Sequence, residues 1–136
     1  MKLIVCIDDH GGLAFNKRRQ SRDSVLIKDV CELAGKEKIY MLPYTEKLFA
    51  DIPEARIKVS DRPLAAAGRG DFCFSELVEV GEYADKIEEL IIYRWNRSYP
   101  SDVMLDVSPE GLGLKLCGVY EFVGTSHEKI TREIYK

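Results

Sequence analysis

Apolar and polar positions alternate along the chain in blocks that predict strands and helices in turn. The run Lys2 to Ile7 is apolar after its first residue and rich in β-branched side chains, which is typical of a strand covered on both faces. After a polar stretch, apolar residues recur at helical spacing, so we expect a helix that begins at an Asp23 cap and ends at Gly35. The stripe that this helix would bury consists of Leu26, Val30, Leu33 and Ala34.

The later blocks continue the same pattern. Strands are predicted over 38–42, 57–60, 71–74, 90–93, 103–107, 114–122 and 130–135, short helical segments over 44–50, 63–67 and 83–89, and a tight turn over 108–111. Asp61 is the expected cap of the 63–67 turn. The strand, helix, strand, helix order favours a parallel sheet with right-handed crossovers, and the last two strands favour an antiparallel end. The sequence therefore predicts one α/β domain over residues 1–136.

Composition and charge exclude several classes of protein. The net charge is −3, so only a local patch such as Lys17 to Arg22 is able to attract a polyanion, and that patch is short and lacks interleaved aromatic residues. Nucleic acid is therefore a disfavoured partner, and we interpret the patch as a mobile charged loop without a binding role. The four cysteines form no CxxC pair and no apolar run has the length of a membrane span, which indicates a reduced, cytoplasmic protein without a membrane partner.

Two polar segments carry the candidate chemistry, and each follows the carboxyl end of an apolar strand. Asp8 to Asp23 follows the first predicted strand, and Arg94 to Arg97 follows the fifth. If these strands are neighbours, both segments face one crevice, which is where open α/β sheets bind ligands. Forked donors and a flat ring there suit an anionic or nucleotide-like ligand. The candidate ligand-binding residues are Asn16, Arg18, Arg19, Gln20, Trp95, Asn96 and Arg97.

The acids and histidines of these segments allow more than one interpretation. Asp23 is either a buried catalytic acid with a raised pKa or a helix cap with no further role, and the two are compatible. Asp8, Asp9 and His10, together with His127 and Glu128, include ligand types for a metal ion and an acid–base pair for a nuclease. Their spacing is unspecific, because consecutive residues at a strand end point in different directions. We therefore assign no metal site.

Several segments resemble the dihydrofolate reductase family. MKLIVCIDDHGGLAFN is similar to that family's first strand and following loop, KIYMLPYTEKLF resembles its second strand and helix start, and YEFVGTSHEKITREIY looks like its closing antiparallel hairpin. The resemblance implies a shortened dihydrofolate-reductase-like fold, with a mixed, mainly parallel sheet flanked by helices and a C-terminal antiparallel hairpin. It also places Asp23 where the family keeps the acid that binds substrate and relays a proton.

The chain departs from the family where the resemblance would imply a dinucleotide cofactor. The family uses a Gly-Arg-x-Thr turn after its second strand, where this chain keeps only the threonine of Leu42-Pro43-Tyr44-Thr45, and a glycine pair after a later strand, which we match to Tyr93-Arg94-Trp95-Asn96. Glycine lets the backbone approach a phosphate, and bulky residues prevent that approach. The cofactor therefore stays unknown.

The RRQS and SHEKIT segments also resemble a group of small uncharacterised bacterial proteins, some of which are called ribonuclease Z. That activity requires clustered histidine and aspartate ligands, and this chain has only two histidines. Three functions stay open: a small-molecule-binding protein, a noncatalytic protein-interaction module on a degenerate reductase fold, and an NADPH-dependent reductase. Whether the protein is an enzyme is left open.

Overall fold

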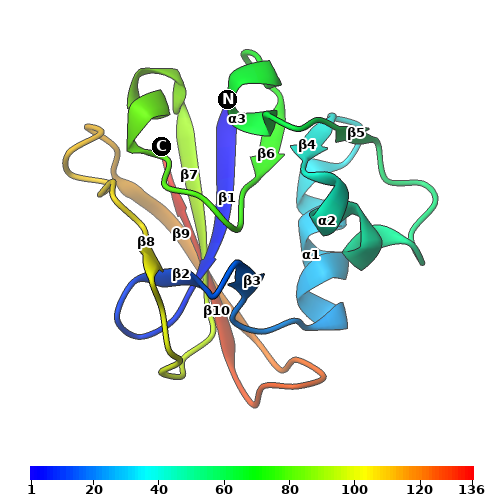
Figure 1. The fold of residues 1–136 in the computed structure, drawn as a ribbon, viewed down its shortest axis with the longest axis vertical. Helices are drawn as coiled ribbons and strands as arrows, with labels where there is room; N and C mark the ends of the chain where they lie inside the picture. Colours follow the sequence, from blue (N-terminus) through cyan, green and yellow to red (C-terminus); the bar gives the residue numbers. More distant parts are fainter.

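The computed structural model describes residues 1–136 and is built on a seven-stranded sheet (Figure 1). The strand order is β5-β4-β6-β1-β7-β10-β9. The first five of these strands run parallel, whereas β10 is antiparallel to β7 and β9 is antiparallel to β10. The predicted fold class is therefore confirmed. The bounds are β1 (Lys2–Ile7), β4 (Ile39–Met41), β5 (Ile57–Val59), β6 (Phe72–Phe74), β7 (Glu89–Arg94), β9 (Leu116–Phe122) and β10 (Ile130–Tyr135).

The main helix, α1 (Ser24–Ala34), begins and ends as its sequence predicts. Asp23 is the N-cap, and Gly35 ends the helix with a φ of 59° while its N–H donates to the Cys31 carbonyl. The buried stripe consists of Leu26, Ile27, Val30 and Ala34, with Ile27 in the place expected for Leu33. The other helices are single turns or little more: α2 (Pro43–Glu46), η1 (Lys47–Phe49), α3 (Pro63–Ala66) and η2 (Gly81–Lys86).

Two hydrophobic clusters lie on opposite faces of the sheet. One packs α1 and Phe49 against sheet residues such as Ile4 and Ile91. The other contains Leu3 and Val5 of the same strand β1, together with Leu64 of α3 and Ile92 of β7. Because successive strand residues point to opposite faces, a strand buried on both faces must be apolar at successive positions, as β1 is from Leu3 to Ile7.

Part of the segment that follows β1 is regular, since the loop predicted over Lys17 to Arg22 contains a strand at Arg18–Arg19, whereas residues 20–22 have no regular structure. Strands β2 (Gly12–Phe15), β3 (Arg18–Arg19) and β8 (Val103–Met104) form a second, three-stranded antiparallel sheet. Phe15 pairs with Arg18, and the two residues between them have positive φ angles of 51° and 61°. This is the geometry of a two-residue hairpin turn, which asparagine at the first position favours.

Two smaller predictions are corrected by hydrogen bonds that the local sequence does not reveal. The strand predicted over 103–107 stops at Met104, because the Asp106 carboxylate accepts from the backbone N–H groups of Val80 and Gly81. Asp61 does not cap α3, whose N-cap is Arg62 without a side-chain bond. The turn predicted over 108–111 is present and is closed by Ser108. No helix of the structure is long and apolar enough to cross a membrane.

Candidate functional site

The crevice that the sequence proposed depends on strands β1 and β7 being neighbours, and they are. Their register places Ile7 opposite Arg94, at the carboxyl ends of both strands. Beyond these ends the Trp95 N–H donates to the Ile7 carbonyl at 3.0 Å, and the Asp9 N–H donates to the Arg97 carbonyl at 2.9 Å. The segments 8–23 and 94–97 therefore lie side by side.

Asp8 ties the two segments together. Its side chain is only 1% exposed, and it accepts from the N–H groups of Gly12 at 2.8 Å, His10 at 3.0 Å and Tyr99 at 2.9 Å. Burial by itself would raise the pKa of Asp8, but these three backbone donors hold the pKa below its ordinary value. Asp8 is therefore an ionised anchor of the loop.

Arg19 points inward and is paired with Glu76, a residue that the sequence analysis did not consider. Nε and Nη2 of Arg19 donate to the two Glu76 oxygens at 2.7 and 2.9 Å, and the Thr45 hydroxyl donates to Glu76 at 2.8 Å. The guanidinium also lies over the Tyr44 ring, 4.1 Å from its centroid. The Arg19 side chain is 17% exposed and the Glu76 side chain 8%, so Glu76 neutralises the charge of Arg19 inside the crevice wall. Glu76 follows β6, which pairs with β1 on the side away from β7.

Three of the seven predicted ligand-binding residues converge on one enclosed space. Arg19, Gln20 and Trp95 line it together with Cys6, Leu13, Ser21, Ser75 and Glu76. Its volume is about 10 Å³, which is room for about one water molecule. In this arrangement the crevice has no space for a flat ring between the hairpin β2–β3 and Trp95.

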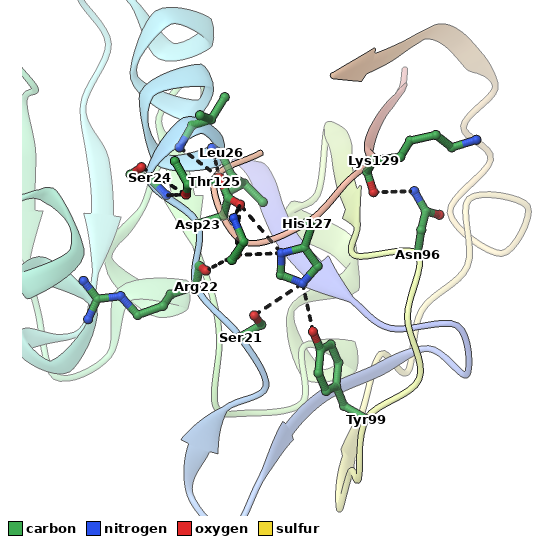
Figure 2. Close-up of polar contacts among 12 residues, drawn as sticks. Ser21, Arg22, Asp23, Ser24, Leu26, Asn96, Tyr99, Thr125, His127 and Lys129 are labelled. Atoms are coloured by element: carbon green, nitrogen blue, oxygen red, sulfur yellow. Dashed lines mark hydrogen bonds and ion pairs between the residues drawn. The ribbon is translucent and has the colours of Figure 1, made fainter. Parts of the chain in front are cut away.

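Beside this space, His127 is held on both ring nitrogens, as Figure 2 shows. Its Nε2 lies 2.8 Å from the Tyr99 hydroxyl and 3.4 Å from Ser21 Oγ, and its Nδ1 lies 2.8 Å from Ser126 Oγ. The Trp95 ring stacks on the imidazole, with centroids 4.6 Å apart. His127 is 4% exposed, and this burial and the charge of Arg97 lower its pKa, although Asp23 opposes the shift. The imidazole is therefore neutral at pH 7.

Asp23 uses both carboxylate oxygens inside the protein (Figure 2). Oδ1 accepts from the N–H groups of Val25 at 2.9 Å and Leu26 at 3.3 Å, as an N-cap does. Oδ2 accepts from the N–H and the hydroxyl of Ser126 at 2.8 and 2.9 Å. Burial would raise the pKa of Asp23, but the donors from Ser126, Thr125 and Leu26 lower it to about 2. The shift is opposite to the raised pKa that the catalytic interpretation requires, and the structure shows the capping role.

The remaining predicted residues do not converge with these three. The Asn96 amide donates to the Lys129 carbonyl at 3.1 Å and to Thr131 at 3.0 Å, so it fastens the segment to β10. Asn16 occupies the hairpin turn. Arg18 and Arg97 are exposed, and neither forms an ion pair with a carboxylate.

A larger groove lies elsewhere, between α1 and the segment 48–54. Its volume is about 520 Å³, within the usual size of small-molecule sites. Three carboxylates and one lysine surround an apolar floor, so this groove favours a neutral or cationic occupant. Its lining consists of Ser24, Val25, Ile27, Lys28, Cys31, Glu32, Leu48, Asp51, Ile52 and Glu54. No sequence motif marked it, because its walls come from a helix face and a distant turn. No group of three or more His, Cys, Asp or Glu side chains lies close enough together to hold a metal ion.

Comparison of the backbone with solved structures gives the fold a name. No protein-family model matches the chain, and no curated protein matches it in sequence. Dihydrofolate reductase from Enterococcus faecalis, solved in complex with NADP(H) and RAB-propyl, superposes with a TM-score of 0.64. The match covers 98% of this chain and 94% of that chain.

The protein has the dihydrofolate-reductase fold. The resemblance of the strand, loop and hairpin segments is thereby confirmed at the level of the fold. Sequence identity over the match is 10%, so the dihydrofolate-reductase likeness describes the backbone and assigns no ligand or reaction.

Proposed function

We propose that the protein binds a small anionic or nucleotide-like molecule at the mouth of the crevice between the segments 8–23 and 94–97. The observation that carries the proposal is the unbalanced positive charge of Arg97. Arg97 is exposed, and no carboxylate forms an ion pair with it. Arg18, on the hairpin that forms the other wall, is also exposed and unpaired. A phosphate or carboxylate would neutralise such cations with charge-assisted hydrogen bonds.

The closed interior limits how such a ligand binds. Because the space beside Trp95 has a volume of only about 10 Å³, the anionic group binds at the surface first. A ring enters between Gln20 and Trp95 only if the β2–β3 hairpin moves away. The nucleotide class is supported by the fold, since the E. faecalis reductase of the same architecture was solved with NADP(H).

A thermal-shift screen tests this proposal with NADPH, dihydrofolate, mononucleotides and phosphorylated sugars. A ligand present at about one hundred times its Kd adds about 2.7 kcal/mol of stability, which raises the Tm of a chain of this size by about 10 °C. Arg97→Ala should abolish the shift and leave the unliganded Tm nearly unchanged. Arg69→Ala is the matched control, because Arg69 is an exposed arginine in the turn before β6 with no ion pair. Arg19 is unsuited to this test, because removing it leaves Glu76 buried without its partner.

The other outcomes separate the alternatives. Loss of the shift in Lys28→Ala but not in Arg97→Ala would place the ligand in the α1 groove and contradict the crevice proposal. A shift with NADPH and dihydrofolate, followed by turnover, would make the protein a reductase. No shift with any compound would favour the noncatalytic interaction module.

A further inference from the structure

The two edges of the seven-stranded sheet differ in how they are protected. At one edge, β5 has three residues, and the central one is Lys58. Short length and an edge lysine are usual devices against pairing with another chain. At the other edge, β9 has seven residues and contains neither lysine nor proline, and its one irregularity is a register shift at Cys117 near its start (Figure 1, orange). Its single charge, Glu121, is already paired with Lys129 at 3.4 Å.

Strand β9 also exposes apolar side chains to solvent, whereas the exposed side chains on the edge strand of a monomer are usually polar. Of the large apolar side chains that are well exposed in the whole protein, half lie between residues 116 and 123, so both faces of this edge strand carry exposed apolar side chains. Leu116 is 53% exposed, Val119 56%, Tyr120 50% and Val123 74%. Since β9 pairs only with β10, every second residue of β9 turns its backbone N–H and C=O outward without a partner. An apolar strip with a free backbone edge fits another β-strand better than it fits a helix or a small molecule.

We propose that β9 pairs antiparallel with β9 of a second copy of this chain, about a two-fold axis at Val119. Such an interface is isologous, because the same residues contribute from both copies. The two sheets then continue into each other, and both unpaired edges disappear. This interaction surface lies on the opposite side of β10 from the crevice strands β1 and β7, so it does not depend on the proposed ligand.

The side chains of β9 are complementary to themselves in this register. Val119 lies opposite Val119 of the second copy, and Gly118 lies opposite Tyr120 of the second copy. Nothing lies within 4 Å of the position that a Gly118 Cβ would take, so the Tyr120 ring has open space to cover. An aromatic side chain across from a strand glycine stabilises the pair, since it covers the exposed backbone.

The charges agree with the same register. Glu121 comes opposite the uncharged Cys117, so no two like charges face each other across the axis. The absence of like-charge contacts, together with a Gly118–Tyr120 pair on each side of the axis, favours pairing with a second copy over pairing with an unrelated strand.

Sedimentation velocity of the full chain from about 1 μM to about 1 mM tests the proposal over the usual range of weak Kd values. The wild type should be a dimer in the upper part of this range. Val119→Lys should be monomeric at all concentrations with a nearly unchanged Tm, because it places two ammonium groups across the axis at an exposed position. Val59→Lys is the matched control, an exposed valine on the β5 edge of the same sheet, and it should stay dimeric. A wild type that is monomeric throughout, or a Val119→Lys variant that still dimerises, would overturn the proposal.

A crosslinking experiment tests the register separately. In Val119→Cys, the two new thiols face each other and should form an intermolecular disulfide or react with a short bis-maleimide. The wild type carries exposed Cys117 on the same strand, which faces Glu121 instead, so it should not crosslink under the same conditions. Crosslinking of the wild type through Cys117, with no increase in the Val119→Cys variant, would contradict the axis at Val119.

Discussion

At the scale of single residues, Asp23 joins the start of helix α1 to a loop more than one hundred positions later in the chain. Oδ1 caps the helix, and Oδ2 accepts from Ser126 twice. The carboxylate is 3% exposed, so these donors replace water around the negative charge. Four hydrogen bonds to one ionised group explain why its pKa lies at about 2, well below the value of 3.8 for a free aspartate.

This pKa predicts a specific dependence of stability on pH. Because the folded pKa is depressed, the stabilisation is complete above the unfolded pKa and is lost as the pH falls from about 4 towards 2. Asp23→Asn should lower the free energy of unfolding by about 2 kcal/mol at pH 7 and by only about 1 kcal/mol at pH 3. Asparagine keeps the cap but presents an amide donor to the Ser126 N–H. Urea denaturation at pH 7, 5 and 3 measures the difference.

The control for this prediction is Asp61→Asn, which changes an exposed carboxylate that caps no helix. It should alter the free energy of unfolding by less than about 0.5 kcal/mol at each pH. A difference between Asp23→Asn and wild type that stays constant from pH 7 to 3 would show that the Asp23 charge is not the stabilising feature.

At the scale of elements, the β2–β3 hairpin is the part of the crevice whose position depends on one close approach. Gly12 begins β2, and a Cβ on it would lie 2.5 Å from Ser101 Cβ and 2.7 Å from the Gln20 amide nitrogen. The Gln20 side chain is flexible enough to move, but Ser101 Cβ is fixed to the backbone of the segment before β8. Glycine is therefore required here by contact and not by its φ angle, which is ordinary.

We expect Gly12→Ala to destabilise the protein by about 2 kcal/mol, because the added methyl group separates β2 from the 99–102 segment. Ser101→Gly in the same chain should restore part of the lost stability, because it removes the Cβ with which the added methyl group clashes. Gly68→Ala is the control, since its added Cβ would make only an ordinary contact at 3.5 Å. Chemical denaturation of the wild type, Gly12→Ala, Ser101→Gly and the double variant gives the coupling energy, and a value near zero would mean that Ser101 is not the obstacle.

The elements that the sequence predicted well are those whose causes are local. The partners of the Asp23 cap lie two and three residues away, and the apolar run of β1 reports its burial directly. The hairpin was missed because a two-residue strand of arginines has no strand pattern and its turn contains no glycine.

Long-range partners account for the rest of what was missed. Tyr99 is 91 residues from Asp8, and Glu76 is 57 residues from Arg19. Such pairs follow from the strand order of the whole sheet and leave no signal in a local window. Sequence reasoning therefore found the two polar segments, but their adjacency, and which of their side chains point into the crevice, came from the structure.

At the scale of the whole molecule, the sheet separates two hydrophobic cores that share its strands. Val30 of α1 lies in the core on one face, and Val80 lies in the core on the other, and both are fully buried. No residue belongs to both clusters, because neighbouring positions on β1 and β7 point to opposite faces. A packing defect in one core should therefore affect the packing of the other core only through the strands of the sheet.

A double-mutant cycle tests that independence. Val80→Ala should cost about 2 kcal/mol, from two lost methyl groups and the cavity that they leave. Val30→Ala should cost somewhat less, because alanine is the better helix former by about 0.5 kcal/mol. In the double variant the two losses should add within about 0.5 kcal/mol, as they do for sites without shared partners. A coupling above about 1 kcal/mol in urea denaturation would instead mean that the sheet transmits packing changes between its faces. The crevice at the ends of β1 and β7 would then respond to substitutions in either core.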